Sequence, residues 1–126
     1  MWNESSVRVN QSLYRVLMAD IANNLAQIQQ RIAVAAENAQ RNPASIALLA
    51  VSKTKPIDMI EAAYAAGQRC FGENYLQDAL PKIEALAELN IEWHYIGRIQ
   101  SNKTRPIAEH FAWVRDRLDQ TCSTIK

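Results

Sequence analysis

The stretch LLAVSKTKP, residues 48–56, decides how the rest of this sequence is interpreted. It belongs to an unbroken apolar run from Ala47 to Val51, and such a short run is typical of a strand buried on both faces of a parallel sheet. Pro56 suits the first turn of a helix, where its missing N–H is not needed. Lys53 is therefore expected where a buried strand gives way to a helix, which in α/β folds is the edge where ligands bind.

The bulk composition of the 126 residues is that of one ordinary folded domain. Apolar residues make up 48% and charged residues 21%, which argues against a disordered or fibrous chain. The net charge of +1, from 14 basic and 13 acidic residues, argues against a function that depends on a strong basic field, so we expect no nucleic-acid partner. No apolar run is long enough to span a bilayer, so we expect no membrane partner.

The cysteines indicate a reducing compartment. Cys70 and Cys122 make no disulfide framework, and neither a CxxC pair nor a His/Cys cluster with ligand spacing occurs, so we predict no metal site. Residues 1–17 contain no apolar stretch of signal-peptide length. Together these features predict a cytoplasmic protein.

Apolar residues recur at helical spacing from about Met18, where Asp20 is the expected N-cap, to Arg41, ahead of Pro43. After this helix, short apolar strands alternate with further helices. The strands are expected at about 46–52, 69–72, 92–96 and 111–114, and the helices at about 56–66, 76–89 and 106–110. This alternation predicts βαβ units and a parallel sheet, whose right-handed crossovers place successive strands side by side.

A polar group follows or closes each of the first three predicted strands. The residues are Lys53 and Lys55, then Glu73 and Asn74, then His94 and Gly97. In a (β/α) barrel the carboxyl ends of the strands form one face, and functional groups come from several of them. The sequence therefore predicts a shared site at this face.

Lys53 has two interpretations. A lysine that forms a Schiff base with an aldehyde must react as the neutral amine, so its pKa must be lowered; desolvation at the end of an apolar strand and a neighbouring cation such as Lys55 both act in this direction. Alternatively, Lys53 is a strand-end lysine whose ammonium reaches water. The residues alone favour the second interpretation, because strongly perturbed lysines are rare.

The neighbouring groups also have ordinary structural explanations. Asn74 is either a ligand contact or a turn-forming residue. His94 lies in an aromatic strand, where a hydrogen-bonded core histidine is more common than a catalytic base. Gly97 either allows close backbone approach or ends a strand. No P-loop, nucleotide-binding glycine fingerprint or Ser–His–Asp arrangement occurs in the sequence.

Three motifs, taken in order, resemble the pyridoxal phosphate homeostasis protein family, also called YggS-like. They are LAVSKTKP at 49–56, FGENY at 71–75, and WHYIG at 93–97 followed by QSNK at 100–103. The resemblance covers about residues 18–114. Because of this resemblance, we favour Schiff-base formation at Lys53 over the interpretation that Lys53 is a solvated lysine.

The resemblance implies an α/β fold, namely the first half of a (β/α)8 TIM barrel of the alanine racemase N-terminal type. This is the so-called fold type III of pyridoxal-phosphate proteins, here with three to four parallel strands and flanking helices. The implied role is to bind, buffer and deliver the cofactor in vitamin B6 homeostasis, rather than to catalyse a reaction.

The implied cofactor is pyridoxal 5′-phosphate, held as a Schiff base on Lys53. Asn74 is expected beside the cofactor ring, and Lys55 is expected to act as a modulating cation. No role is assigned to the other expected rim residues. The full set of expected cofactor-binding residues is Lys53, Lys55, Asn74, His94, Gly97 and Asn102.

The chain departs from the family pattern at both ends. Residues 1–17 are an expected N-terminal extension, residues 18–115 a partial barrel domain, and residues 116–126 a divergent tail that suggests a disrupted reading frame. A full barrel needs about 250 residues, so we expect a truncated barrel without the later phosphate-binding segments. A half-barrel has two open sheet edges, which favour pairing with other chains, so self-association is expected.

Two alternative functions stay open from the sequence. One is an amino-acid racemase or another enzyme of the same fold type, which would need an acid–base pair across the cofactor. The other is a truncated remnant that binds nothing, because the phosphate-binding half is missing.

Overall fold

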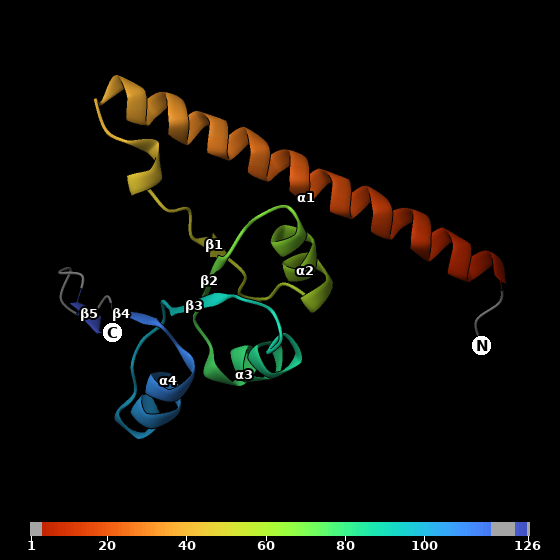
Figure 1. Cartoon of the computed structure of the whole chain (residues 1–126). Helices are drawn as coiled ribbons and strands as arrows, with labels where there is room; N and C mark the ends of the chain where they lie inside the picture. The colour runs from red at the N-terminus through yellow and green to blue at the C-terminus, as the bar shows by residue number, and fades with distance from the viewer. Residues whose placement is uncertain (1–3, 117–122, 126) are drawn as a thin grey trace. The chain divides into compact units, whose positions relative to one another are not determined.

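The computed structural model describes residues 4–116 and 123–125, with side chains for residues 18–115 (Figure 1). Its elements in chain order are α1 (Glu4–Asn38), η1 (Pro43–Ser45), β1 (Ala50–Val51), α2 (Ile57–Ala65), β2 (Cys70–Glu73), α3 (Leu76–Ala85), β3 (Glu92–Tyr95), η2 (Ser101–Lys103), α4 (Thr104–His110), β4 (Trp113–Asp116) and β5 (Ser123–Ile125). The chain divides into two compact units, residues 1–46 with 58–67 and residues 47–57 with 68–126. The first holds α1, η1 and most of α2, and the second holds the sheet with α3, η2 and α4.

The first unit begins with one long helix, α1. The predicted start near Met18 is wrong: the helix starts at Glu4, so Asp20 lies inside it and is not an N-cap. No glycine or proline precedes Pro43, so nothing in residues 4–17 interrupts a helical backbone. No helix in the described part of the chain, α1 included, is both long and apolar enough to cross a membrane.

The end of α1 is closed by backbone geometry ahead of Pro43. Arg41 N donates to Ala36 O (2.8 Å), and Gln40 N donates to Glu37 O (3.1 Å). Gln40 has a φ of 57°, the left-handed conformation that this Schellman pattern requires. The helix therefore ends a few residues earlier than the proline alone predicts.

The second unit is built on a sheet with strand order β1-β2-β3-β4-β5. The strands β1 to β4 are parallel, with Ala50 opposite Phe71, Phe71 opposite Trp93, and His94 opposite Trp113. The helix α3 packs against β2, and α3 and α4 lie side by side (Figure 1). The predicted α/β class, with parallel strands and flanking helices, is confirmed. Neighbours in sequence are neighbours in the sheet, which is the order of consecutive strands in a (β/α) barrel.

The strand β1 is shorter and more exposed than predicted. Only Ala50 and Val51 pair with β2, and Val51 keeps 48% of its surface exposed. The expectation of a strand buried on both faces is therefore wrong. Among the described residues β1 lies at the edge of the sheet, and an edge strand has a neighbour on one side alone, which leaves more of it open to water.

The last strands also differ from the prediction. The strand β4 begins at Trp113 rather than at Phe111, because Phe111 closes α4: its N–H donates to Ile107 O (3.1 Å). The strand β5 pairs antiparallel with β4, with Val114 opposite Ile125, where a tail without a pattern was expected. Residues 117–122 of that predicted tail lie outside the described residues.

The core of the second unit joins the sheet to its helices. The buried apolar side chains are Phe71, Leu76, Ala79, Leu86, Trp93, Tyr95, Ile107, Phe111 and Val114. The ring centroids of Phe71 and Trp93 are 5.9 Å apart, and Tyr95 meets Phe111 edge-to-face at 5.2 Å. This core holds the strand ends that carry the predicted site.

Candidate functional site

The carboxyl ends of β1, β2 and β3 meet at one edge of the sheet. Two hydrogen bonds continue the parallel ladder beyond the paired strands: Ser52 N donates to Gly72 O (2.9 Å) and Ile96 N donates to Glu73 O (2.8 Å). Lys53, Asn74 and Gly97 each follow one of these strand ends. The structure therefore places these three predicted residues along a common edge, here called the rim.

Asn74 and Gly97 are in direct contact at the rim. A Cβ on Gly97 would overlap the Asn74 carbonyl and lie only 2.9 Å from the Asn74 Cα, so only glycine fits there. The Asn74 Oδ1 atom is buried and has no hydrogen-bond partner within the described part of the chain. A buried acceptor without a partner is costly and needs an explanation. Such an atom suits a contact to a bound ligand.

A cavity of about 460 Å³ adjoins this contact. It is formed by the β2–α3 connection and by the segment between β3 and α4. Its lining residues are Asn74, Tyr75, Leu76, Gln77, Tyr95, Gly97, Arg98, Gln100 and Lys103. Arg98 and Lys103 supply two cationic groups, which favour an anionic ligand.

Lys53 and Lys55 lie in the turn that follows β1, and both side chains are exposed. Lys55 N donates to Ser52 O (3.0 Å), and Thr54 adopts a left-handed φ of 63°. The desolvation of Lys53 that the apolar run predicts is not found, because β1 is an exposed edge strand. Neither lysine lines the cavity at Asn74.

A buried network beside Lys53 was not predicted. The ammonium of Lys82, on α3, donates to Ser52 O (2.9 Å), to both Glu73 carboxylate oxygens (3.1 and 3.2 Å) and to Asp78 Oδ2 (3.0 Å). The Ser52 hydroxyl also donates to the Glu73 carboxylate. Glu73 is fully buried and Lys82 is 5% exposed. The network therefore ties the ends of β1 and β2 to α3 directly below the rim.

One sequence signal for this network exists in retrospect. Lys82 follows Ala79 by three residues and precedes Leu86 by four, so it occupies the apolar face of its helix. The spacing of Asp78 and Lys82, four residues apart, predicts only an ordinary exposed ion pair on a helix. The second partner of Lys82, Glu73 on β2, depends on how α3 packs against the sheet, and no local sequence pattern predicts this packing.

His94 and Asn102 do not line the cavity at Asn74. His94 is buried within β3 opposite Gly72 in the ladder. Its Nε2 lies 2.9 Å from Glu92 Oε1, and its ring stacks on Trp113 at a centroid distance of 6.1 Å. The ring is therefore buried in the sheet, and a role for His94 in binding the cofactor stays a prediction. Asn102 is exposed in η2, and it is its neighbour Lys103 that lines the cavity.

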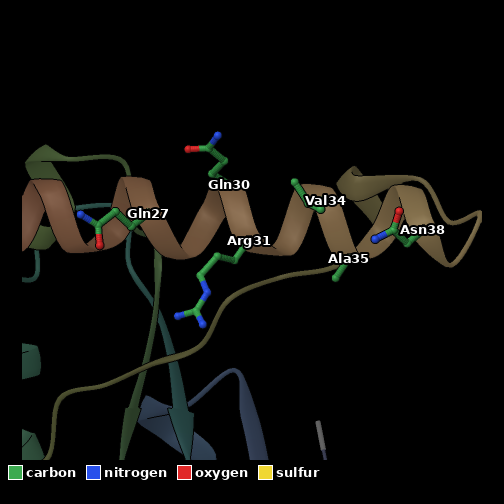
Figure 2. Close-up of a pocket in the computed structure, with 6 residues that line it drawn as sticks. All are labelled: Gln27, Gln30, Arg31, Val34, Ala35 and Asn38. Atoms are coloured by element: carbon green, nitrogen blue, oxygen red, sulfur yellow. The ribbon is translucent and has the colours of Figure 1, made fainter.

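A second hollow carries no site. It is lined by residues of α1 alone, and their side chains leave the helix in different directions (Figure 2). The residues are Gln27, Gln30, Arg31, Val34, Ala35 and Asn38. Val34 is 51% exposed, and the polar side chains of this set do not point toward one another, so this surface does not enclose a ligand.

Cys70 has a perturbed thiol at the start of β2. Its ladder partner is Glu92, the first residue of β3. Burial of the thiol and, to a smaller extent, the negative charge of Glu92 raise the pKa of Cys70 above its usual value. Both causes disfavour the thiolate.

Comparisons with known proteins agree with the resemblance seen in the sequence. A Pseudomonas aeruginosa protein named pyridoxal phosphate homeostasis protein is 60% identical over 103 residues, which cover 80% of this chain and 45% of the relative. This chain is a homologue of the pyridoxal phosphate homeostasis proteins. The Escherichia coli K12 protein of that name is 54% identical over 106 residues, which cover 80% of this chain and 45% of the relative. The chain thus spans about half the length of the curated relatives that it matches.

Solved structures match the same part of the chain. PipY of Synechococcus elongatus without pyridoxal phosphate (PLP) aligns with a TM-score of 0.63 and 43% identity, over 76% of this chain and 40% of PipY. PipY with PLP bound aligns with a TM-score of 0.60 and 43% identity, over 75% of this chain and 40% of PipY. No family model matches the chain.

The buried network predicts a large effect of Lys82→Met on stability. This change leaves the buried Glu73 carboxylate without its counter-charge, and breaking a buried pair in this way costs about 3–5 kcal/mol. Urea unfolding of the full chain measures the loss. The exposed Lys55→Met is the matched control and should change the free energy of unfolding by less than about 0.5 kcal/mol. Equal effects of the two changes would contradict the buried network.

The raised pKa of Cys70 predicts slow alkylation at neutral pH. Only the thiolate reacts, so the pH–rate curve for iodoacetamide at Cys70 should lie at higher pH than that of a free cysteine. In Glu92→Gln the repelling charge is gone while burial remains, so the curve should move to lower pH without reaching the free value. Mass-spectrometric peptide mapping separates Cys70 from Cys122, and Glu88→Gln is the exposed control. A Glu92→Gln curve that coincides with the wild-type curve would refute the charge effect.

Proposed function

We propose that this chain binds pyridoxal 5′-phosphate and serves vitamin B6 homeostasis in the cytoplasm. The observation that carries the proposal is the match, at 43% identity, to PipY with PLP bound, together with relatives named for PLP homeostasis. The positions of Lys53, Asn74 and Gly97 on one rim support a ligand site at this edge. The cations Arg98 and Lys103 in the adjoining cavity suit a phosphorylated ligand.

Lys53 is the proposed attachment point. Its neutral amine condenses with the aldehyde of the cofactor, forming a C=N bond and releasing one water. Ser52, the preceding residue, is held by Gly72 O, by the Glu73 carboxylate and by the ammonium of Lys82. The backbone under Lys53 is thus fixed while its exposed side chain stays accessible to an aldehyde from solution.

Asn74 and Gly97 are the proposed supporting residues. The unpartnered Asn74 Oδ1 offers a hydrogen-bond acceptor to the bound cofactor, and the missing side chain of Gly97 lets the two backbones lie in contact. Lys55 adds positive charge near the turn. The proposed role is that of a carrier, because the curated relatives are named for homeostasis rather than for a reaction.

A PLP titration of the full chain tests this function. The expected result is an absorbance band of a Schiff base, and one trapped adduct on Lys53 after borohydride reduction and mass spectrometry. Lys53→Ala should weaken binding at least about tenfold, or 1.4 kcal/mol, and remove that adduct, whereas the exposed neighbour change Lys55→Ala should keep it. An adduct distributed evenly over the exposed lysines, or unchanged binding in Lys53→Ala, would contradict the proposal.

A further inference from the structure

Three side chains with metal-binding atoms converge at the amino ends of β2 and β3. Cys70 and Glu92 begin these strands and are opposite each other in the ladder, while Gly72 is opposite His94. Side chains alternate between faces along a strand, so Cys70, Glu92 and His94 share one face of the sheet. Their thiol sulfur, carboxylate oxygen and ring nitrogen all lie within 4.8 Å of one another. These are the atoms that bind borderline-soft metal ions.

His94 is the buried member of this cluster. Its Nδ1 atom is buried and, among the residues that the structure describes, has no hydrogen-bond partner. Its other ring nitrogen lies 2.9 Å from Glu92 Oε1. The ring is held in place by stacking on Trp113, with planes 13° apart. The ring nitrogen that faces Glu92 is Nε2, and the stacked ring holds it in position for a metal ion.

We propose that Cys70, Glu92 and His94 form a Zn²⁺ site with one position open to water. One sulfur, one nitrogen and one oxygen donor match the ligands that Zn²⁺ accepts, and three protein ligands with a free fourth position give a tetrahedral open site. The thiolate disfavours Mg²⁺ and Ca²⁺, which prefer oxygen ligands. On binding, the S–H bond of Cys70 is replaced by a Zn–S bond and the proton passes to solvent, with no change of oxidation state.

The geometry needs only a small adjustment. Tetrahedral zinc with ordinary bond lengths sets its ligand atoms about 3.4–3.6 Å apart. The three ligand atoms lie within 4.8 Å of one another, and the His94 Nε2 and Glu92 Oε1 atoms are 2.9 Å apart, so the present separations bracket this value. Glu92 can adjust freely because its side chain is 45% exposed, while the stacked ring of His94 stays fixed. Side-chain rotation is therefore enough to close the site.

This site is separate from the rim. Cys70 and Glu92 begin strands whose carboxyl ends lead to Asn74 and Gly97, so the two sites lie at opposite ends of the parallel strands. Barrel folds carry their ligand sites at the carboxyl end, and groups at the amino end usually serve stability. The evidence for the zinc site therefore does not depend on PLP, and each site can be tested in a variant that lacks the other.

Metal titration of the full chain tests the proposal. After treatment with a chelator, Zn²⁺ should bind at one ion per chain with a Kd below about 10 μM. Co²⁺ in place of Zn²⁺ should give tetrahedral ligand-field bands and a thiolate-to-cobalt charge-transfer band. Losing a residue that only hydrogen-bonds to a metal ligand costs roughly 10–100-fold in affinity. We expect a larger loss of Zn²⁺ affinity in each ligand variant, namely Cys70→Ser, Glu92→Gln and His94→Gln. Circular dichroism melts of the metal-free variants report whether each one folds.

Matched controls separate this site from other thiols and histidines. Cys122→Ser and His110→Gln should leave the affinity and the cobalt spectrum unchanged. Cys70→Ser should remove the charge-transfer band in a chain that still melts cooperatively, which ties the metal to this sulfur even if His94→Gln disturbs the fold. The proposal is overturned by a Kd above about 10 μM, by a Cys70→Ser or Glu92→Gln affinity within about threefold of wild type, or by loss of the charge-transfer band in Cys122→Ser.

Discussion

The buried contact between Lys82 and Glu73 is the interaction on which the rim of the sheet depends. Glu73 is fully buried, and the Lys82 ammonium also donates to Ser52 O and Asp78, so each charge has hydrogen bonds that offset its desolvation. A buried ion pair adds little net stability compared with apolar residues of the same volume, but removing one partner leaves an uncompensated buried charge. Here the pair and its hydrogen bonds join the end of β1, the end of β2 and α3.

The weakness of β1 explains why such a contact matters. The strand pairs over two residues and lies at the sheet edge of the described chain, so few ladder hydrogen bonds hold it. Ser52 compensates, because its N–H bonds to Gly72 O and its hydroxyl to the Glu73 carboxylate. Lys53 therefore starts from a fixed backbone, yet its side chain is open to solvent. This combination suits a lysine that meets an aldehyde arriving from solution.

Features written in local patterns could be predicted from the sequence, and features that depend on packing could not. Alternating apolar segments predict the parallel sheet, and the residues that follow them, Lys53, Asn74 and Gly97, do lie along one edge. The role of Lys82 depends on how α3 meets β2. The approach of Cys70 to the first residues of β3 depends on the strand register, since more than twenty residues separate them in sequence. The site at the amino end was for this reason missed by a search for ligand spacing.

Hydrogen exchange of backbone amides in the full chain, with and without PLP, tests the central claim that the rim holds the cofactor. The account predicts that PLP slows exchange at residues 53–55, 74–75 and 97–98, with little change at the amino ends of β2 and β3, and that Lys53→Ala loses this protection. Protection that is absent, or that appears on α1 or at the amino ends of the strands instead, would contradict the account.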